Sequence, residues 1–138
     1  MLELEPIERD AMRMLLAGDH PALEILRQQF AQSTVTKREY TGVGFFTDFA
    51  VPDCLTVVRK PRIIIADVSA EIEGLEHGCG FILFVETGEL TLECHLWGED
   101  ELPRDANYTR LYYIHQPNPP AVEETETRDM EALSLVWV

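Results

Sequence analysis

The segment Cys79 to Leu96, CGFILFVETGELTLECHL, constrains the fold of this 138-residue chain more than any other. Two runs of strand-forming residues flank Thr87 and Gly88, a pair typical of a tight turn between antiparallel strands. With these two residues as the loop, the pairing of the strands is determined. The predicted pairs are Glu86 with Glu89, Val85 with Leu90, Leu83 with Leu92, Phe81 with Cys94, and Cys79 with Leu96. One face of this hairpin is wholly apolar, and a shift of one residue would turn charged side chains into the core.

The same hairpin holds two of the three cysteines of the chain. Cys79 and Cys94 lie on its apolar face, and we interpret them as core residues because free cysteine is among the most buried residue types. A redox pair between these diagonal neighbours is the alternative. Cys94 and His95 are adjacent in a strand, so their side chains leave opposite faces and cannot share a metal ion. We therefore expect no metal site and no cofactor. The third thiol, Cys54, lies in a predicted loop, and the sequence leaves its reactivity open.

Residues 6–32 are predicted to form two helices, because their apolar residues recur at spacings of three and four. Pro6 fits the first turn of the first helix, and Gly18 is suited to end it. Asp19 is predicted to cap the N-terminus of the second helix, and His20 to support the turn. The apolar faces consist of Ile7, Ala11, Met14 and Leu15 in the first helix and of Leu23, Leu26 and Phe30 in the second.

From residue 35 the apolar pattern changes to a period of two, which predicts strands as far as residue 116. Besides the hairpin, the strand-forming segments are GVGFFTDFAV, RIIIADVSAEI and YTRLYYIH. We predict an α+β fold in one domain, residues 1–138, with two N-terminal helices packed on one face of a mainly antiparallel sheet of about five strands.

The tail, residues 117–138, begins acidic and ends apolar, and the sequence leaves open whether it is a docking helix or a terminal strand. Its apolar residues are expected to pack against the body or against a second copy in a homodimer. These residues are Leu133, Leu135, Val136, Trp137 and Val138.

The chain is strongly acidic, with a formal net charge of −14. Between Asp67 and Asp105 there are eleven acids and one base, Arg104. Such a surface repels phosphate, so we expect no nucleic-acid partner and consider a basic protein instead. The apolar runs are too short to span a bilayer, and no secretory signal precedes them, so we expect no membrane partner. An odd number of cysteines without close pairs favours the cytoplasm.

The segment DVSAEIEGLEH, residues 67–77, carries the candidate functional residues. Asp67, Glu71 and Glu73 share parity along an extended strand, so they are expected to line one face. Glu76 and His77 follow in a loop among glycines. Glu71, Glu73, Glu76 and His77 are our candidate partner-binding residues. Asp67, Glu71, Glu73 and His77 are the residues that a small enzyme would use for acid–base work or to hold a hard cation.

Two phrases, R-E-x-T-G-x-G-F-F and G-L-x-x-G-x-G-F-x-L-F, resemble a family of small, mostly uncharacterised bacterial proteins. They correspond here to residues 38–46 and 74–84, and the resemblance covers about residues 13–103. It implies a short helical start followed by the sheet, and it assigns no catalytic residue. The chain departs from the pattern at LECHLWGEDELP and in the segment after Pro103.

Three functions remain open. The first is a protein-binding module, for example an immunity-type protein that masks a basic toxin or enzyme, because the sequence contains an acidic run and no catalytic constellation. The second is a small enzyme that uses the acidic and histidine cluster. The third is a structural homo-oligomer that associates through the apolar tail.

Overall fold

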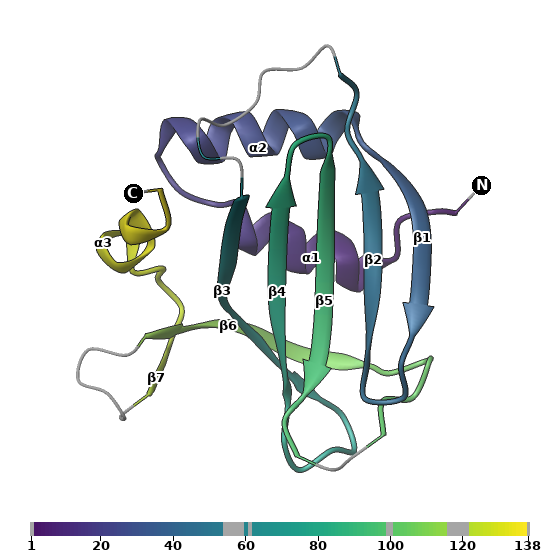
Figure 1. Ribbon diagram of the computed structural model, residues 1–138. Coiled ribbons are helices and arrows are strands. Elements are labelled where there is room, and N and C mark those ends of the chain that lie inside the picture. Colours follow the sequence, from purple (N-terminus) through teal and green to yellow (C-terminus); the bar gives the residue numbers. More distant parts are fainter. Residues whose placement is uncertain (1, 54–59, 61, 99–100, 116–121, 138) are drawn as a thin grey trace.

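The computed structural model describes residues 2–53, 60, 62–98, 101–115 and 122–137 (Figure 1). The helices are α1 (Pro6–Leu15), α2 (Pro21–Gln32), α3 (Met130–Leu133) and the short 3₁₀ helix η1 (Ser134–Trp137). The strands are β1 (Thr34–Tyr40), β2 (Gly44–Ala50), β3 (Arg62–Ile72), β4 (Cys79–Glu86), β5 (Glu89–Leu96), β6 (Tyr108–His115) and β7 (Glu123–Thr125). They form one antiparallel sheet in the order β1-β2-β5-β4-β3-β6-β7, so the fold is α+β as expected.

The β4–β5 hairpin has the predicted pairing at every position. Cys79 pairs with Leu96 at one end and Glu86 with Glu89 at the turn, where Gly88 has a φ of 81°. The side chains of the predicted apolar face are buried, and the two cysteines are free thiols within the core, as expected. A hydrogen bond to Cys79, together with burial, raises the pKa of the Cys94 thiol far above its usual range, so this sulfur remains protonated at neutral pH.

The N-terminal helices begin and end close to the predicted positions. In α1 the Glu5 and Glu8 side chains form a reciprocal capping box that satisfies free backbone N–H groups. The predicted cap of α2 is wrong by one residue. The N-cap is His20, whose Nδ1 accepts from the Ala22 backbone N–H at 3.0 Å, whereas Asp19 is exposed. An imidazole nitrogen fills the role that we assigned to a carboxylate.

Two parts of the predicted architecture are corrected. The sheet has seven strands rather than about five, because β1 extends one edge and β7, from the tail, extends the other. The helical layer is not made of the two N-terminal helices alone, since α3 and η1 come from the C-terminal segment. The tail, left open as helix or strand, contains both.

The apolar residues of the tail differ in burial. Leu133 is buried, and Trp137 stacks on His20 with ring centroids 5.1 Å apart. Leu135 is 73% exposed, so the expectation that it packs within the chain is wrong. Val138 lies outside the described residues.

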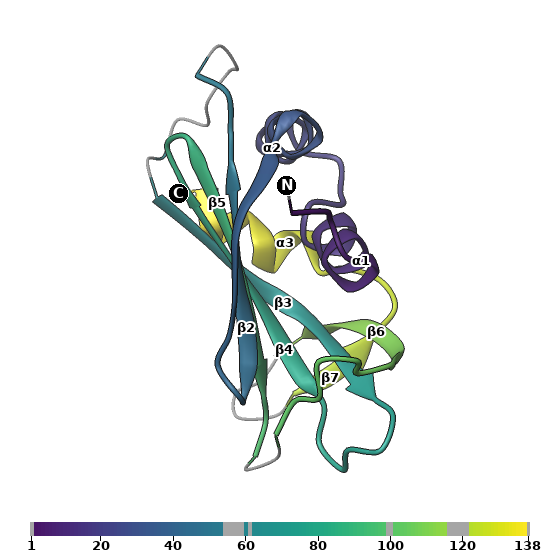
Figure 2. The same cartoon turned by 90° about the vertical axis from the view of Figure 1, so that its right-hand side faces the viewer.

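The sheet is covered on one face only (Figure 2). Helix α1 lies close to β3 and β4, and α2 adds Leu23 and Leu26 to the core and sets Phe30 edge-on to Phe49, 5.4 Å between ring centroids. We call this side the covered face. The opposite side, which points toward the reader in Figure 1, carries none of the helices in the described part of the chain and is called the open face.

A β-bulge between Ile65 and Val68 changes which residues of β3 point into the core. Before the bulge the buried residues are Ile63 and Ile65, and after it they are Val68, Ala70 and Ile72. The strand bends there, so that β6 and β7 turn toward the side of α1 (Figure 2). Within the described residues no helix is long and apolar enough to cross a membrane.

Candidate interaction surface

The bulge in β3 separates the acids that the sequence placed on one face. Asp67 lies at the bulge and forms two hydrogen bonds with the guanidinium of Arg128, at 2.8 and 2.9 Å. Glu71, beyond the bulge, lies on the open side and pairs with Arg110 of β6 at 3.3 Å. The expectation that Asp67 and Glu71 share a face is wrong, because the extra residue of the bulge reverses the alternation between them.

Asp67 has a structural partner on the covered face. Arg128 is buried, and its Nη1 also donates to the carbonyl oxygens of Met14, Leu15 and Ala17 at 2.8 to 3.0 Å. These carbonyls end α1, where a helix has no hydrogen-bond donors of its own. Asp67 therefore orients the arginine that caps α1, and we assign it no part in a functional site.

The other three acids and His77 lie at one end of the open face. The Glu73 carboxylate accepts from the side-chain amide of Asn107 at 2.8 Å, whereas Glu76 is exposed. The His77 ring packs close to Gly98, where an added Cβ would lie 3.1 Å from the imidazole. These groups do not converge on one point, and within the described residues no three His, Cys, Asp or Glu side chains are placed to hold a metal ion.

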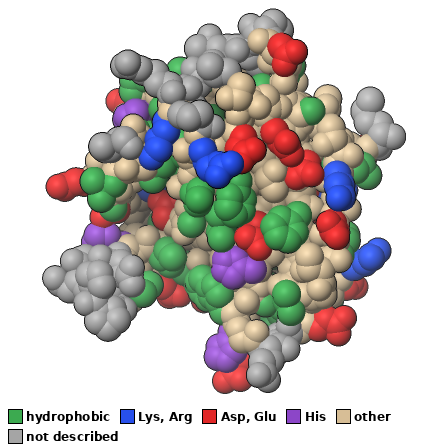
Figure 3. Space-filling view, viewed as in Figure 1, with side chains coloured by type: hydrophobic (Ala, Val, Ile, Leu, Met, Phe, Trp, Pro, Cys, Tyr) green, Lys and Arg blue, Asp and Glu red, His purple; other side chains and the backbone are tan. Residues whose placement is uncertain are grey.

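The middle of the open face is apolar. Figure 3 shows hydrophobic side chains gathered over the sheet, with acidic side chains between and around them. Ile64 is 50% exposed, and Trp97 is 37% exposed. The half-buried apolar residues of this face are Phe46 of β2, Ile82 and Phe84 of β4, and Ile114 of β6. The sequence placed Ile82 and Phe84 on the side of the hairpin away from the core, but it did not indicate that apolar residues of β2, β3 and β6 would join them there.

His95 of β5 and Trp97, which directly follows the strand, are held together on the open face. The indole Nε1 of Trp97 donates to Nε2 of His95 at 3.2 Å, so the imidazole proton resides on Nδ1. Both rings lie over Gly80 of β4, where a Cβ would come within 3.0 Å of His95. A glycine is required at this position because any side chain would displace the two rings.

Two polar atoms of the open face lack a hydrogen-bond partner in the part of the chain that the structure describes. They are Oγ of Ser69 and Nδ1 of His95, which lie in one row across β3, β4 and β5. Buried polar atoms are nearly always satisfied in a finished interior. Nε1 of Trp137, which stacks on His20 at the start of α2, also has no partner among the described residues, so unsatisfied polar atoms do not distinguish the two faces.

Acidic side chains accompany the apolar residues of the open face. Asp48 accepts from the hydroxyl of Thr91 at 2.9 Å, and Glu86 pairs with Arg62 at 3.1 Å. Glu89 and Glu93 form no ion pair within the described residues. No ion pair with a described residue balances their negative charge, and exposed apolar surface lies next to them.

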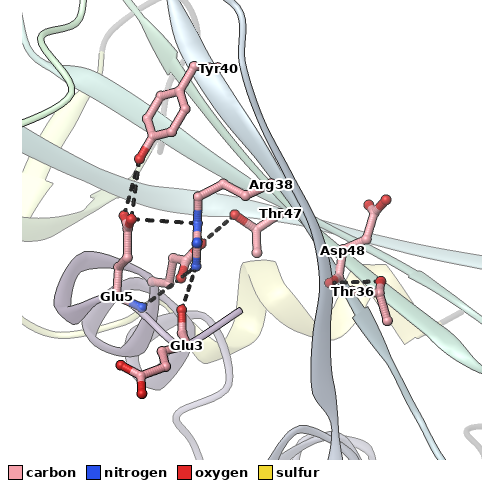
Figure 4. A network of polar contacts seen from close by, with 8 residues as sticks. Glu3, Glu5, Thr36, Arg38, Tyr40, Thr47 and Asp48 are labelled. Atoms are coloured by element: carbon pink, nitrogen blue, oxygen red, sulfur yellow. Dashed lines mark hydrogen bonds and ion pairs between the residues drawn. The ribbon is translucent and has the colours of Figure 1, made fainter. Parts of the chain in front are cut away.

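The charged cluster on the covered face is, by contrast, fully paired (Figure 4). Glu8 is completely buried, and its carboxylate accepts from Arg38, from the Thr47 hydroxyl and from the Glu5 backbone N–H. The hydrogen bond to Glu8 raises the pKa of the Arg38 guanidinium. This cluster fastens the N-terminal end of α1 to β1 and β2, and we interpret it as structural.

Comparison with protein-family models, with curated proteins and with solved structures found no match to this chain. The resemblance of the two strand phrases to a bacterial family therefore stays a prediction. Cys54, whose reactivity the sequence left open, lies outside the described residues. The function has to follow from the geometry of the surface.

Proposed function

We propose that this protein is a protein-binding module that holds a basic partner on the open face of its sheet. The observation that carries the proposal is that Ile64 and Trp97 expose apolar surface on the same face as Glu89 and Glu93, which form no ion pair within the described residues. A contiguous apolar patch is unfavourable in water, and a covering protein removes that cost. The uncompensated carboxylates select a partner with lysine or arginine around its own apolar contacts.

The candidate residues from the sequence extend this surface at one end. Glu71, Glu76 and His77 are exposed, and the His77 ring lies close to Gly98, which follows Trp97 in the chain. They belong to the polar rim of such an interface, where each side chain contributes little to affinity and more to the rate of association. An immunity-type role, in which the module masks a basic toxin or enzyme, is the concrete form of this proposal.

The test is capture of a partner by the purified protein, with single variants that change one face at a time. Glu93→Lys reverses a charge on the open face, and Ile82→Asp places a charge in its apolar centre. We expect each to weaken binding by about tenfold or more, because central interface residues carry most of the binding energy. Binding of the unaltered protein should also weaken as salt is raised.

Asp19→Lys is the matched control, since it makes the same change of charge at an exposed position between α1 and α2. It should leave binding unchanged. A partner that binds the Glu93→Lys protein as tightly as the unaltered one, or that is itself acidic, would contradict the proposal.

A second candidate is self-association through the tail. Val122 and Leu135 are both well exposed, and they line the same cavity, of about 770 Å³, beside β6. Light scattering on the unaltered protein and on Leu135→Asp separates the two ideas, because only an assembly through the tail should dissociate in the variant. The enzyme alternative receives no support from the geometry, since Asp67 is committed to Arg128 and the remaining groups diverge.

A further inference from the structure

A second concave site lies on the covered face, at the N-terminal end of α1. It has a volume of about 610 Å³ and is enclosed by the start of α1, the end of β1, and residues 102–108 before and within β6. Tyr40 of β1 forms one wall, and its side chain points toward α1 (Figure 4). The site is therefore separated from the open face by the sheet itself.

The walls of this site are aromatic. Tyr40 and Phe45 lie with ring centroids 6.1 Å apart, and Tyr108 lines the same cavity from β6. Burial raises the pKa of both tyrosines, so their rings remain neutral phenols at any ordinary pH. The electron-rich faces of such rings attract cations.

A hydrogen bond of Tyr40 further favours a cation on its ring. Its hydroxyl donates to the Glu5 carboxylate at 3.3 Å, which places additional negative charge on the phenol. The guanidinium carbon of Arg104 already lies 4.6 Å from the centre of the Tyr40 ring. The contact between Arg104 and Tyr40 thus shows that this wall accepts a guanidinium group.

Three acids and one base line the cavity. Glu5, Asp10 and Asp105 are the acids, and Arg104 is the base. Glu5 also lies 3.7 Å from Arg38 and Asp10 lies 3.8 Å from Arg13, so Asp105 is the lining acid that forms no ion pair within the described residues. Arg104 is exposed and lies in a loop, so little holds its side chain over the ring. Ile7 and Leu111 provide apolar surface for an aliphatic stem.

We propose that this cavity binds a guanidinium group carried on an aliphatic stem, such as an arginine side chain, and that Arg104 competes with it for the face of Tyr40. The stem contacts the apolar wall, the guanidinium stacks on Tyr40, and its N–H groups reach the carboxylates at the rim. A guanidinium suits this site better than an ammonium, because it is planar and stacks on aromatic rings. The proposal does not depend on the function proposed for the open face.

The experiment is a titration of the full chain with Nα-acetyl-arginine amide, followed by amide chemical shifts. We expect saturable binding with a dissociation constant on the order of millimolar, as is usual for so small a ligand. The citrulline analogue has the same shape without the charge and should not bind measurably. The lysine analogue should bind more weakly than the arginine analogue.

Variants test the roles of the two side chains. Arg104→Gln removes the competitor and should tighten binding by about twofold to fivefold, the range of an exposed cation–π contact. Tyr40→Leu in the Arg104→Gln protein should abolish that gain. Arg62→Gln, the same change of charge on the open face, is the control and should leave the dissociation constant within about twofold of the unaltered value.

Three results would overturn the proposal: equal binding of the arginine and citrulline analogues, equal or tighter binding of the lysine analogue, or an unchanged affinity in Arg104→Gln. Amide spectra recorded at the start of each titration establish that every variant is folded. Glu93→Lys should bind the arginine analogue like the unaltered protein, so failure of the open-face proposal and failure of this one give different results.

Discussion

The two faces of the sheet differ in how their charged side chains are paired. On the covered face Glu8 and Asp67 each meet an arginine, and these two pairs fasten the two ends of α1. On the open face the ion pairs are exposed, as between Arg62 and Glu86, or absent, as at Glu93. A buried charge must be paired for the chain to fold, whereas an unpaired acid beside apolar surface serves no purpose in folding. The difference separates the residues needed for stability from those left for a partner.

The largest expected effect comes from removing one carboxylate charge on each face. Glu8→Gln takes the fully buried counter-charge away from Arg38, which keeps only the more exposed Glu5 carboxylate at 3.7 Å, and should lower the free energy of unfolding by about 3 kcal/mol. Glu86→Gln removes the same charge from an exposed pair and should cost less than about 1 kcal/mol. Urea unfolding of both variants measures the difference. Similar losses of unfolding free energy in the two variants would show that charges on the two faces contribute equally to stability.

The second prediction uses adjacent residues of β4. Leu83 is fully buried against the helices, and Leu83→Ala should cost about 2 to 5 kcal/mol through lost burial and a cavity. Ile82 points to the open face, and Ile82→Ala should cost roughly 1 kcal/mol or less. Thermal or urea unfolding provides the comparison. A larger loss for Ile82 would mean that the open face is packed in a way that its exposure does not indicate.

The third prediction concerns alkaline pH. Burial raises the pKa of Tyr112, on the open face, from 10.0 to about 12, and raises that of Tyr108, on the covered side, further. Above pH 10 the unfolded chain loses these phenolic protons while the folded chain keeps them, so stability should fall as pH rises. For Tyr112 the loss should run from about pH 10 to 12.

Unfolding measured against pH, with tyrosinate absorbance as a second signal, checks this expectation. Tyr112→Phe should flatten part of the decline, and Tyr108→Phe should flatten more of it. An identical decline in both variants and the unaltered protein would assign the effect to other groups.

The smallest expected effect is that of a charge reversal on the open face. Glu93→Lys should change the free energy of unfolding by no more than about 0.5 kcal/mol, because surface substitutions without a structural partner rarely do more. The same variant is expected to bind the partner about tenfold more weakly or worse. A marked loss of stability would mean that Glu93 has a structural role, and its effect on binding would then need a different explanation.

The hairpin could be predicted from the sequence because its information is local. Thr87-Gly88 sets the turn, and alternation on both sides leaves one register that buries Leu83 and Leu92. The bulge in β3 has no such signal, since Ile65, Ala66, Asp67 and Val68 continue an ordinary strand pattern. Missing it placed Asp67 on the same face as Glu71.

The remaining errors arise from contacts between distant segments. Arg128 pairs with Asp67 across 61 positions of the sequence, and no local pattern announces that an arginine of the tail will cap α1. The open face was missed for a different reason. Ile82 and Phe84 alternate with Phe81 and Leu83, and apolar residues on both faces of a strand are also typical of a strand covered on both sides.

The cap that Arg128 provides to α1 has a consequence for the order in which the chain is made. Ala17, whose carbonyl oxygen accepts from Arg128, leaves the ribosome 111 residues before its donor does. At typical rates of synthesis that interval is roughly 6 to 22 s. During this time the carbonyl oxygens of Leu15 and Ala17 lack the guanidinium that they accept from in the folded chain. This cap at the end of α1 therefore cannot form until translation is nearly finished.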